Sequence, residues 1–142
     1  MARIDFYVLG QSGEQARQIF ACRLAEKAYR LDNTVHIHAH DQATAERIDE
    51  LLWTFRDGSF VPHCVTRPGV DDAGAAVTVG CDTSEPGPRD LLINLGNEIP
   101  ACAAAFPRVA ELVTSDEESK QHSRRRFAAY RDQGHELQTH NV

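Results

Sequence analysis

The sequence predicts one α/β domain over residues 1–142, with three layers and a mostly parallel sheet. Over the first half of the chain, short apolar and β-branched runs alternate with longer helix-compatible segments. This strand–helix–strand–helix order implies parallel strands joined by right-handed crossovers. Residues 91–95 read LLINL, an almost unbroken apolar run that is typical of a strand covered by helices on both faces.

The elements can be placed in order along the chain. The expected strands are residues 4–9, 34–39, 77–79, 91–95 and 108–113. The expected helices are residues 13–31, 41–55 with Asp41 as N-cap, a short Ala-rich helix at 101–106, and a terminal helix from a Ser115-x-x-Glu118 capping box to Gly134. Residues 66–75 and 82–90 are dense in Gly, Pro, Asp and Ser, which predicts two surface loops.

The composition excludes several classes of protein. The chain has 15 basic and 21 acidic side chains, a formal net charge of -6, which argues against a protein that follows nucleic acid through its overall field. No apolar run is as long as a membrane span, and the N-terminus enters a strand pattern without a secretion signal, so we expect a cytoplasmic protein. The four cysteines form no C-x-x-C pair and are interpreted as reduced, mostly buried side chains.

The turn after the first strand is the first place to look for a nucleotide site. It reads GQSGEQ, which contains Gly10 and Gly13 but neither G-x-G-x-x-G nor the G-K-[ST] ending. Glu14 would place a negative charge at the same helix end, which disfavours a phosphate. We therefore expect a plain turn with no nucleotide or other cofactor. Because no nucleophile elbow, Cys/His pairing or distinctive carboxylate pair is present, we expect no catalysis either.

Three histidines stand at alternate positions of the second strand, in the sequence VHIHAH. An extended chain would display His36, His38 and His40 on one face, where three imidazoles could bind zinc or copper. The plainer interpretation is a strand whose face meets a helix through polar rings or opens to solvent near its end. The sequence favours this plainer interpretation over a metal site, so no metal is predicted.

The helix at residues 41–55 carries its aromatic side chain on an unexpected face. Its apolar stripe is Ile48, Leu51, Leu52 and Phe55, and Trp53 lies about 150° from the centre of that stripe. Phe60, Val61 and Pro62 follow shortly afterwards. Two interpretations remain open: an interface anchor, or a loop that folds back on Trp53 as a small satellite cluster.

The terminal helix carries a narrow basic stripe. Lys120, Arg124, Phe127 and Arg131 lie within about 60° of one another at helical spacing. Such a stripe is often only a solvated face, yet nothing local explains an aromatic ring among cations. An apolar floor with a cationic rim suits an acidic peptide that ends in an apolar residue and a free carboxylate. Binding of a single nucleic-acid strand is the competing use.

Several segments together resemble the chi subunit family of bacterial DNA polymerase III, accessory proteins of the clamp loader. They are FYVL at residues 6–9, DELLW at 49–53, SFVPH at 59–63, RDLLINL at 89–95 and K-x3-R-x2-F-x2-Y-R-x2-G at 120–134. The resemblance implies a Rossmann-like domain without nucleotide or catalysis, acting in DNA replication at the replisome and contacting DNA only indirectly.

The resemblance also implies two partners. The psi subunit would bind a surface formed by Trp53, Phe60, Val61, Pro62 and His63, for which a repair helicase could compete. The acidic C-terminal tail of single-stranded-DNA-binding protein would bind Val113, Lys120, Arg124, Phe127, Arg131 and Leu137. The sequence departs from the family at Phe127, where a tyrosine is expected, and at Ala128, where a lysine is expected.

Two other functions are carried as alternatives. One is a small α/β nucleotide- or metal-binding enzyme or sensor that uses the GQSG turn or the histidine strand. The other is direct binding of single-stranded nucleic acid by the basic terminal helix, which would depend steeply on salt.

Overall fold

The computed structural model describes residues 2–55, 58, 60–66, 75–81 and 89–142. The strands are β1 Arg3–Val8, β2 Val35–His38, β3 His63–Val65, β4 Val77–Gly80, β5 Leu91–Asn94, β6 Arg108–Val113 and β7 Glu136–Asn141. The helices are α1 Glu14–Arg30, α2 Gln42–Thr54, α3 Glu117–Asp132 and the short 3-10 helix η1 Ala101–Ala105. The predicted α/β class and the predicted strands and helices are confirmed.

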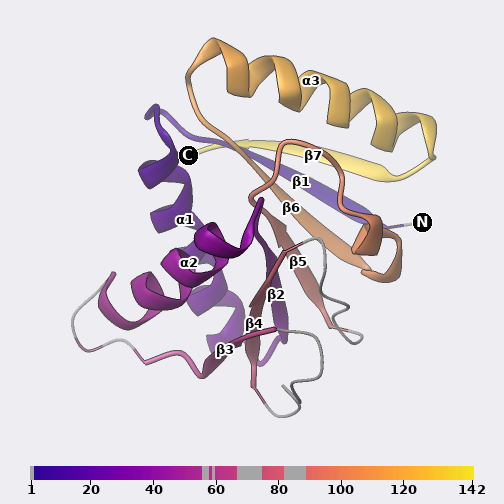
Figure 1. Cartoon of the computed structure of the whole chain (residues 1–142). Coiled ribbons are helices and arrows are strands. Elements are labelled where there is room, and N and C mark those ends of the chain that lie inside the picture. The colour runs from indigo at the N-terminus through magenta and orange to yellow at the C-terminus, as the bar shows by residue number, and fades with distance from the viewer. Residues whose placement is uncertain (1, 56–57, 59, 67–74, 82–88) are drawn as a thin grey trace.

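All seven strands form one sheet in the order β3-β4-β2-β5-β6-β1-β7, and every pair of neighbours is parallel. Helices α1 and α2 cover one face and α3 covers the other, over β1, β6 and β7 (Figure 1). The predicted three-layer arrangement is therefore present. The two layers of helices cover different parts of the sheet. Strand β3 forms the edge near α2, and strand β7 forms the edge near α3.

Two hydrophobic cores stabilise the layers. Between the sheet and helices α1 and α2, aliphatic side chains such as Ile37, Ile48 and Leu52 are almost completely buried. On the α3 side, a smaller core combines Phe6, Phe106 and Tyr130 with aliphatic residues of β1, β5 and β6. The apolar stripe predicted for residues 41–55 is confirmed, because Ile48, Leu51 and Leu52 are buried.

The N-caps of helices α2 and α3 are carboxylates. The side chain of Asp41 accepts a hydrogen bond from the Thr44 backbone N–H at 2.7 Å, as predicted for α2. The prediction for α3 was wrong by one residue: Asp116, not Ser115, is the N-cap, and its carboxylate accepts from the Ser119 backbone N–H at 3.3 Å. The Ser119 hydroxyl, in the first turn of α3, accepts a hydrogen bond from the Thr114 backbone N–H.

Two strands were missed by the sequence prediction. Strand β3 has only three residues, too few to show alternation. Strand β7 reads ELQTHN and is mostly exposed, so it lacks the apolar pattern by which strands are recognised. The predicted loops at 66–75 and 82–90 fall almost entirely outside the described residues.

The four cysteines are not joined in disulfides, in agreement with their predicted reduced state, and Cys22 and Cys81 are buried. No helix within the described ranges is long and apolar enough to cross a membrane.

Candidate functional site

The first candidate surface lies near the β3 edge and is called the aromatic surface, defined by Trp53, Phe60, Pro62 and His63. The side chains of Trp53 and Phe60 are 59% and 64% exposed, and their ring centroids lie 5.9 Å apart. The Trp53 ring also meets the His63 ring at 4.8 Å in an edge arrangement. The loop thus does fold back on Trp53, yet both larger rings stay exposed to solvent.

His63 fixes this surface from beneath. Its side chain is nearly buried, with Nδ1 2.6 Å from the Val61 carbonyl oxygen and Nε2 3.1 Å from the Asp49 carbonyl oxygen. The Asp49 contact joins the segment to helix α2, so the position of Phe60 relative to Trp53 is determined by packing. Val61, which the resemblance assigned to the surface, is 1% exposed and belongs to the core.

The second candidate surface lies on α3 near the β7 edge and is called the basic surface, defined by Lys120, Arg124, Phe127, Arg131 and Leu137. Arg124 is exposed and lies 3.5 Å from the Glu117 carboxylate, while Arg131 is exposed and lies 3.7 Å from that of Asp132. Solvent-exposed ion pairs such as these contribute little to stability. Each arginine can therefore release its own carboxylate and bind that of a partner.

Phe127 has a structural reason for its position, which the sequence did not reveal. Its ring is partly buried and packs on the ring of Phe6 in β1, with centroids 5.3 Å apart. Leu137 of β7 is also partly buried against this core. Val113, assigned to the same site by the resemblance, is 3% exposed and supports the surface from inside. The stripe therefore offers exposed cations beside a partly exposed apolar floor.

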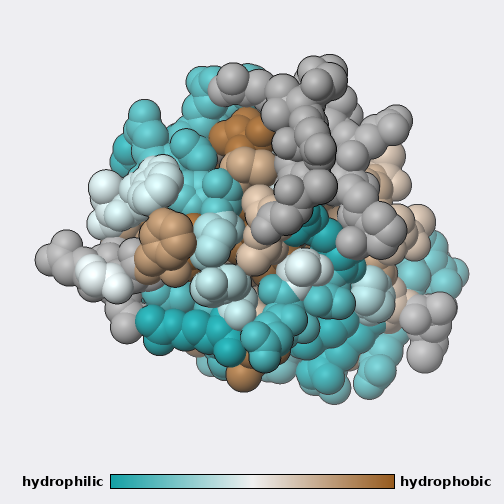
Figure 2. Space-filling view, turned by 90° about the horizontal axis from the view of Figure 1, so that it is seen from below, coloured by the Kyte–Doolittle hydropathy of each residue, from teal (hydrophilic) through white to brown (hydrophobic). Residues whose placement is uncertain are grey.

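Outside these two surfaces, the exposed large hydrophobic side chains of the described residues are Leu31 and Val142. Seen from below, the described surface is mainly hydrophilic, and hydrophobic residues appear only in small separate groups (Figure 2). A partner that binds this protein on such a face would rely on a few aromatic or charged anchors rather than on a broad apolar contact.

A carboxylate of the chain itself lies at the turn after β1. Helix α1 begins after Gly13, whose φ of 97° favours glycine. Hydrogen bonds lower the pKa of the Asp116 carboxyl. The largest effect comes from the Thr114 hydroxyl, and a smaller one comes from the Gly13 backbone N–H. The chain thus supplies its own anion at this turn.

The three histidines of the β2 segment differ in environment. His36 is buried against the Phe106 ring, and its Nδ1 lies 2.7 Å from the Thr78 hydroxyl. Burial, with smaller effects of His38 and Arg89, lowers the pKa of His36 to about 3. His38 is buried and His40 is exposed. Among the described residues, no group of three His, Cys, Asp or Glu side chains is arranged to hold a metal ion.

A buried polar network on the α3 side escaped the sequence analysis. The carboxylate of Glu111 is fully buried, accepts hydrogen bonds from Tyr130 Oη at 2.7 Å and Asn94 Nδ2 at 3.0 Å, and lies 2.9 Å from Arg126 Nε. The Arg126 N–H is not aligned for a hydrogen bond, so this contact is an ion pair. Burial raises the pKa of Glu111 despite these partners, and burial together with Glu111 raises the pKa of Tyr130.

The fold and these surfaces define a doubly wound α/β domain whose candidate sites are surfaces that can bind partners. A solved structure of T4 UvsW shares this fold, with a TM-score of 0.70 and 10% identity over 99% of this chain and 41% of that one. A sequence profile of the family described as DNA polymerase III chi subunit, HolC, matches residues 1–138.

Curated relatives agree with this profile. The DNA polymerase III subunit chi of Pseudomonas aeruginosa is 42% identical over 142 residues, which cover 100% of this chain and 98% of that protein. The subunits chi of Escherichia coli K12 and Haemophilus influenzae are 33% and 32% identical, each covering at least 96% of both chains. The chain belongs to the DNA polymerase III chi subunit family, and its process is therefore DNA replication.

Proposed function

We propose that this chain is a non-catalytic link within the DNA polymerase III assembly at the replisome. The aromatic surface binds the psi subunit of the clamp loader, and the basic surface binds the acidic C-terminal tail of single-stranded-DNA-binding protein. The observation that carries the proposal is the presence, in a member of the chi family, of two chemically different exposed surfaces at opposite edges of one sheet.

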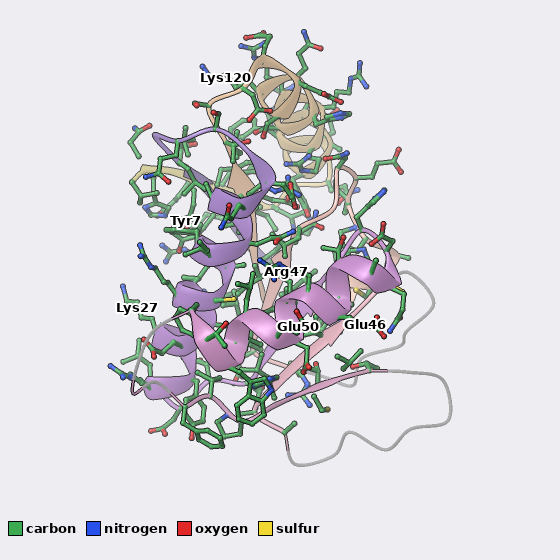
Figure 3. The ribbon with its side chains drawn as sticks, turned by 60° about the vertical axis from the view of Figure 1, so that its left-hand side comes forward. Tyr7, Lys27, Glu46, Arg47, Glu50 and Lys120 are labelled. Carbon is green, nitrogen blue, oxygen red and sulfur yellow. The ribbon has the colours of Figure 1, made fainter. Side chains whose placement is uncertain are left out.

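The separation of the two surfaces supports simultaneous binding. Strands β3 and β7 are the two outermost strands of a seven-stranded sheet. Lys120 stands at the start of α3, far from the charged outer face of α2 with Glu46, Arg47 and Glu50 (Figure 3). A partner on one surface therefore leaves the other accessible, as a linking protein requires.

The chemistry of the basic surface favours an acidic tail over DNA. Three cations flank the partly exposed Phe127 ring, which suits a carboxylate next to an apolar side chain. The net charge of -6 for the whole chain opposes long contacts with a phosphate backbone. The tail's owner, which coats the DNA, makes the contact with the nucleic acid.

The chemistry of the aromatic surface favours an apolar segment of a partner protein. Trp and Phe rings provide large contact areas at a low cost in side-chain entropy and are typical anchors of protein interfaces. Trp53 and Phe60 present adjacent rings whose relative position is fixed through His63. The same anchors would accept a repair helicase, so psi and the helicase would exclude one another.

The binding of the tail can be tested with a fluorescent acidic peptide that ends in phenylalanine, followed by anisotropy. Arg124→Ala should weaken binding about fivefold to tenfold, at the low end for a lost charge-assisted contact because Arg124 is 69% exposed. The matched control is Arg125→Ala, which removes an equal charge about 100° away on the same helix and should leave the affinity unchanged. Equal affinities for the wild-type chain and Arg124→Ala would overturn this assignment.

The binding of psi can be tested by co-purification of the two subunits. Trp53→Ala should abolish the complex while it leaves peptide binding unchanged, because the aromatic ring is exposed and its loss costs little stability. Leu31→Ala, which removes a side chain of similar exposure (65%) elsewhere, is the control and should retain psi. If Trp53→Ala retains psi as well as Leu31→Ala does, the aromatic surface is not the psi site.

A further inference from the structure

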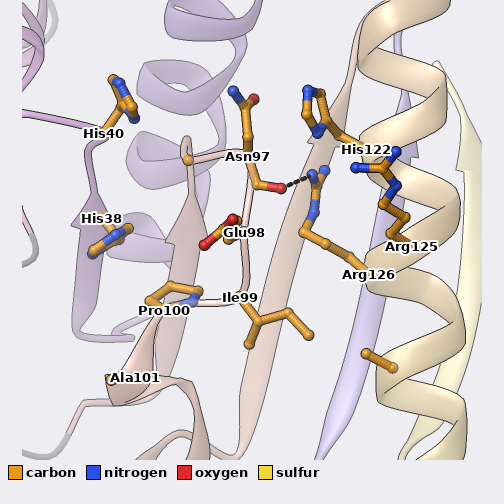
Figure 4. A pocket seen from close by; sticks show the side chains of 12 residues that line it. His38, His40, Asn97, Glu98, Ile99, Pro100, Ala101, His122, Arg125 and Arg126 are labelled. Atoms are coloured by element: carbon orange, nitrogen blue, oxygen red, sulfur yellow. Dashed lines mark hydrogen bonds between the residues drawn. The ribbon is translucent and has the colours of Figure 1, made fainter.

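A pocket of about 640 Å³ lies at the carboxyl ends of β2 and β5, on the side of α3 away from the basic surface. The loop after β5 crosses it, with His38 and His40 on one side and His122 and Arg125 of α3 on the other (Figure 4). Its volume is in the range of sites for small organic ligands. Neither surface discussed above includes these side chains.

The pocket occupies a point where neighbouring strands connect to opposite faces of the sheet. Strands β2 and β5 are neighbours, but β2 continues into α2 on one face whereas β5 continues into η1 on the other. The two connections therefore diverge and leave a crevice between them. Open α/β sheets bind their ligands in this position, outside the carboxyl ends of the strands.

Buried polar side chains hold the loop after β5 in place. Arg126 donates to the Asn97 carbonyl oxygen at 2.8 Å, and Asn94 both accepts from the Gly96 N–H at 2.8 Å and donates to the Glu98 carbonyl oxygen at 3.0 Å. Arg17 of α1 donates to the Leu95 carbonyl oxygen from the opposite face. Because burying such groups costs free energy, their use on one short loop marks a pre-formed wall rather than a chance hollow.

A side chain at position 96 would crowd the base of this loop. A Cβ atom at Gly96 would lie 3.2 Å from Asn94 Oδ1 and 3.6 Å from the His38 ring. The first of these contacts is tighter than ordinary van der Waals contact, so a larger residue would displace the Asn94 side chain that holds the loop.

The charges that line the pocket favour an anion. Arg125 is exposed and has no carboxylate partner among the described residues. Imidazoles stand on both sides of the loop, and that of His122 lies 3.7 Å from the Glu118 carboxylate. Glu98 is the single carboxylate among the described lining residues, and its carboxylate points toward His38 (Figure 4). Ile99, Pro100 and Ala101 add an apolar section. The lining thus combines cations, one hydrogen-bond acceptor and an apolar patch.

We propose that this pocket binds a nucleoside phosphate, with the phosphate held by the Arg125 and His122 side. Glu98 accepts hydrogen bonds from sugar hydroxyls or a base amino group, and the apolar section at residues 99–101 receives the base. The site is distinct from the GQSG turn after β1, where Asp116 takes the place of a phosphate. A free nucleotide and the terminal nucleotide of a DNA strand share this chemistry.

The proposal can be tested by NMR titration of the 15N-labelled full chain with deoxyadenosine monophosphate. Amide shifts should concentrate at residues 38–40, 96–101 and 122–129. Arg125→Ala should weaken binding about tenfold or more, the effect of losing a charged hydrogen bond, while Arg124→Ala should bind like the wild type. Both arginines are exposed, so neither variant should disturb the fold. Absence of shifts in these segments, or equal effects of the two variants, would overturn the proposal.

Further titrations identify the source of the ligand. Adenosine without phosphate should bind much more weakly than the monophosphate, because it lacks the group that Arg125 holds. A short single strand with a 5′-phosphate, compared with the same strand without it, tests the strand end. If the phosphorylated strand shifts residues 96–101 and the unphosphorylated strand does not, the site accepts a strand terminus as well as the monophosphate. If adenosine or the unphosphorylated strand binds as well as its phosphorylated form, the assignment of the phosphate is wrong.

Discussion

The two sides of the sheet are stabilised in different ways. The side covered by α1 and α2 has a mainly aliphatic interior, with Ile37, Ile48 and Leu52 at its centre. Its buried charged side chains Arg17 and Glu26 pair with exposed side chains of α1. The side covered by α3 contains fewer apolar residues and a fully buried carboxylate, Glu111, with Arg126 as its ion-pair partner. Aliphatic packing has no preferred direction, whereas hydrogen bonds and ion pairs fix particular atoms relative to one another.

The buried polar contacts lie where they fix the position of α3 relative to β6 and to the loop after β5. Arg126 ties α3 both to Glu111 in β6 and to the loop after β5, and Tyr130 adds a second link from α3 to the same carboxylate. The basic surface and the proposed pocket lie on opposite flanks of α3, so both depend on the placement of this helix. The comparison teaches that buried polar contacts, centred on Glu111 on the α3 side, set geometry in this small domain, while the aliphatic side supplies most of the burial.

Breaking the buried ion pair should have the largest effect. Arg126→Met leaves the Glu111 carboxylate buried without its cation, which should lower the free energy of unfolding by about 3–5 kcal/mol. The measurement is urea unfolding at neutral pH. The double variant Arg126→Met/Glu111→Gln replaces the unpaired carboxylate with a neutral amide and should recover a large part of the loss.

The aliphatic side provides the control for that experiment. Leu52→Ala should also destabilise the domain, by about 2–5 kcal/mol, because it leaves a cavity under α2. Adding Glu111→Gln to Leu52→Ala should destabilise the domain further, because Arg126 is then buried without its anion. If Glu111→Gln rescues both variants equally, the contrast between the two sides is false.

His36 should make the stability of the α3 side depend on pH. Its pKa falls to about 3 in the folded chain, so protonation favours the unfolded state; the stability it contributes is complete above the unfolded pKa near 6.5 and is lost as pH falls toward 3. Between pH 6.5 and pH 5 the loss should be about 1.5 kcal/mol. Comparison of urea unfolding for the wild type and His36→Gln over this range isolates the contribution, because the other titrating groups are common to both.

The cause of the shift can be separated with Thr78→Val. This variant removes the hydroxyl 2.7 Å from His36 Nδ1 but keeps the imidazole buried. Since burial is the main cause of the lowered pKa, the pH dependence of Thr78→Val should match that of the wild type. A slope as shallow as that of His36→Gln would assign the effect to the hydrogen bond instead.

Much of this fold could be predicted because its strands are buried. Strands such as β5, which are apolar throughout, stand out against the polar loops, and Asp41 is a recognisable N-cap. The edge strands β3 and β7 could not be found in this way, since an edge strand shows one side to solvent and needs no apolar pattern. The pairing of β7 with β1 depends on residues more than 130 positions apart, which no local pattern contains.

The candidate surfaces were partly predictable for a similar reason. Helical periodicity located Trp53 outside the core and grouped Lys120, Arg124 and Arg131 on one stripe, because these depend only on the geometry of one helix. The packing of Phe127 on Phe6 and the burial of Val61 required contacts between distant elements. The network around Glu111 brings together residues of β5, β6 and α3 whose spacing in the sequence has no distinctive pattern.

The smallest expected effect concerns a polar contact on the α3 side that remains exposed to solvent. Asp116 caps α3, and its carboxylate also accepts from the Thr114 hydroxyl at 2.5 Å. Asp116→Ala should lower the free energy of unfolding by about 1 kcal/mol, the usual cost of a lost N-cap, well below that of Arg126→Met. Because the pKa of Asp116 is lowered in the folded chain, its contribution is present above its unfolded pKa and is lost as pH falls through the lower folded value. Asp132→Ala, an exposed carboxylate at the other end of the same helix, is the control and should change the stability little. A loss for Asp116→Ala as large as that for Arg126→Met would mean that exposed and buried polar contacts stabilise α3 equally, and that burial is not what distinguishes the two sides of the sheet.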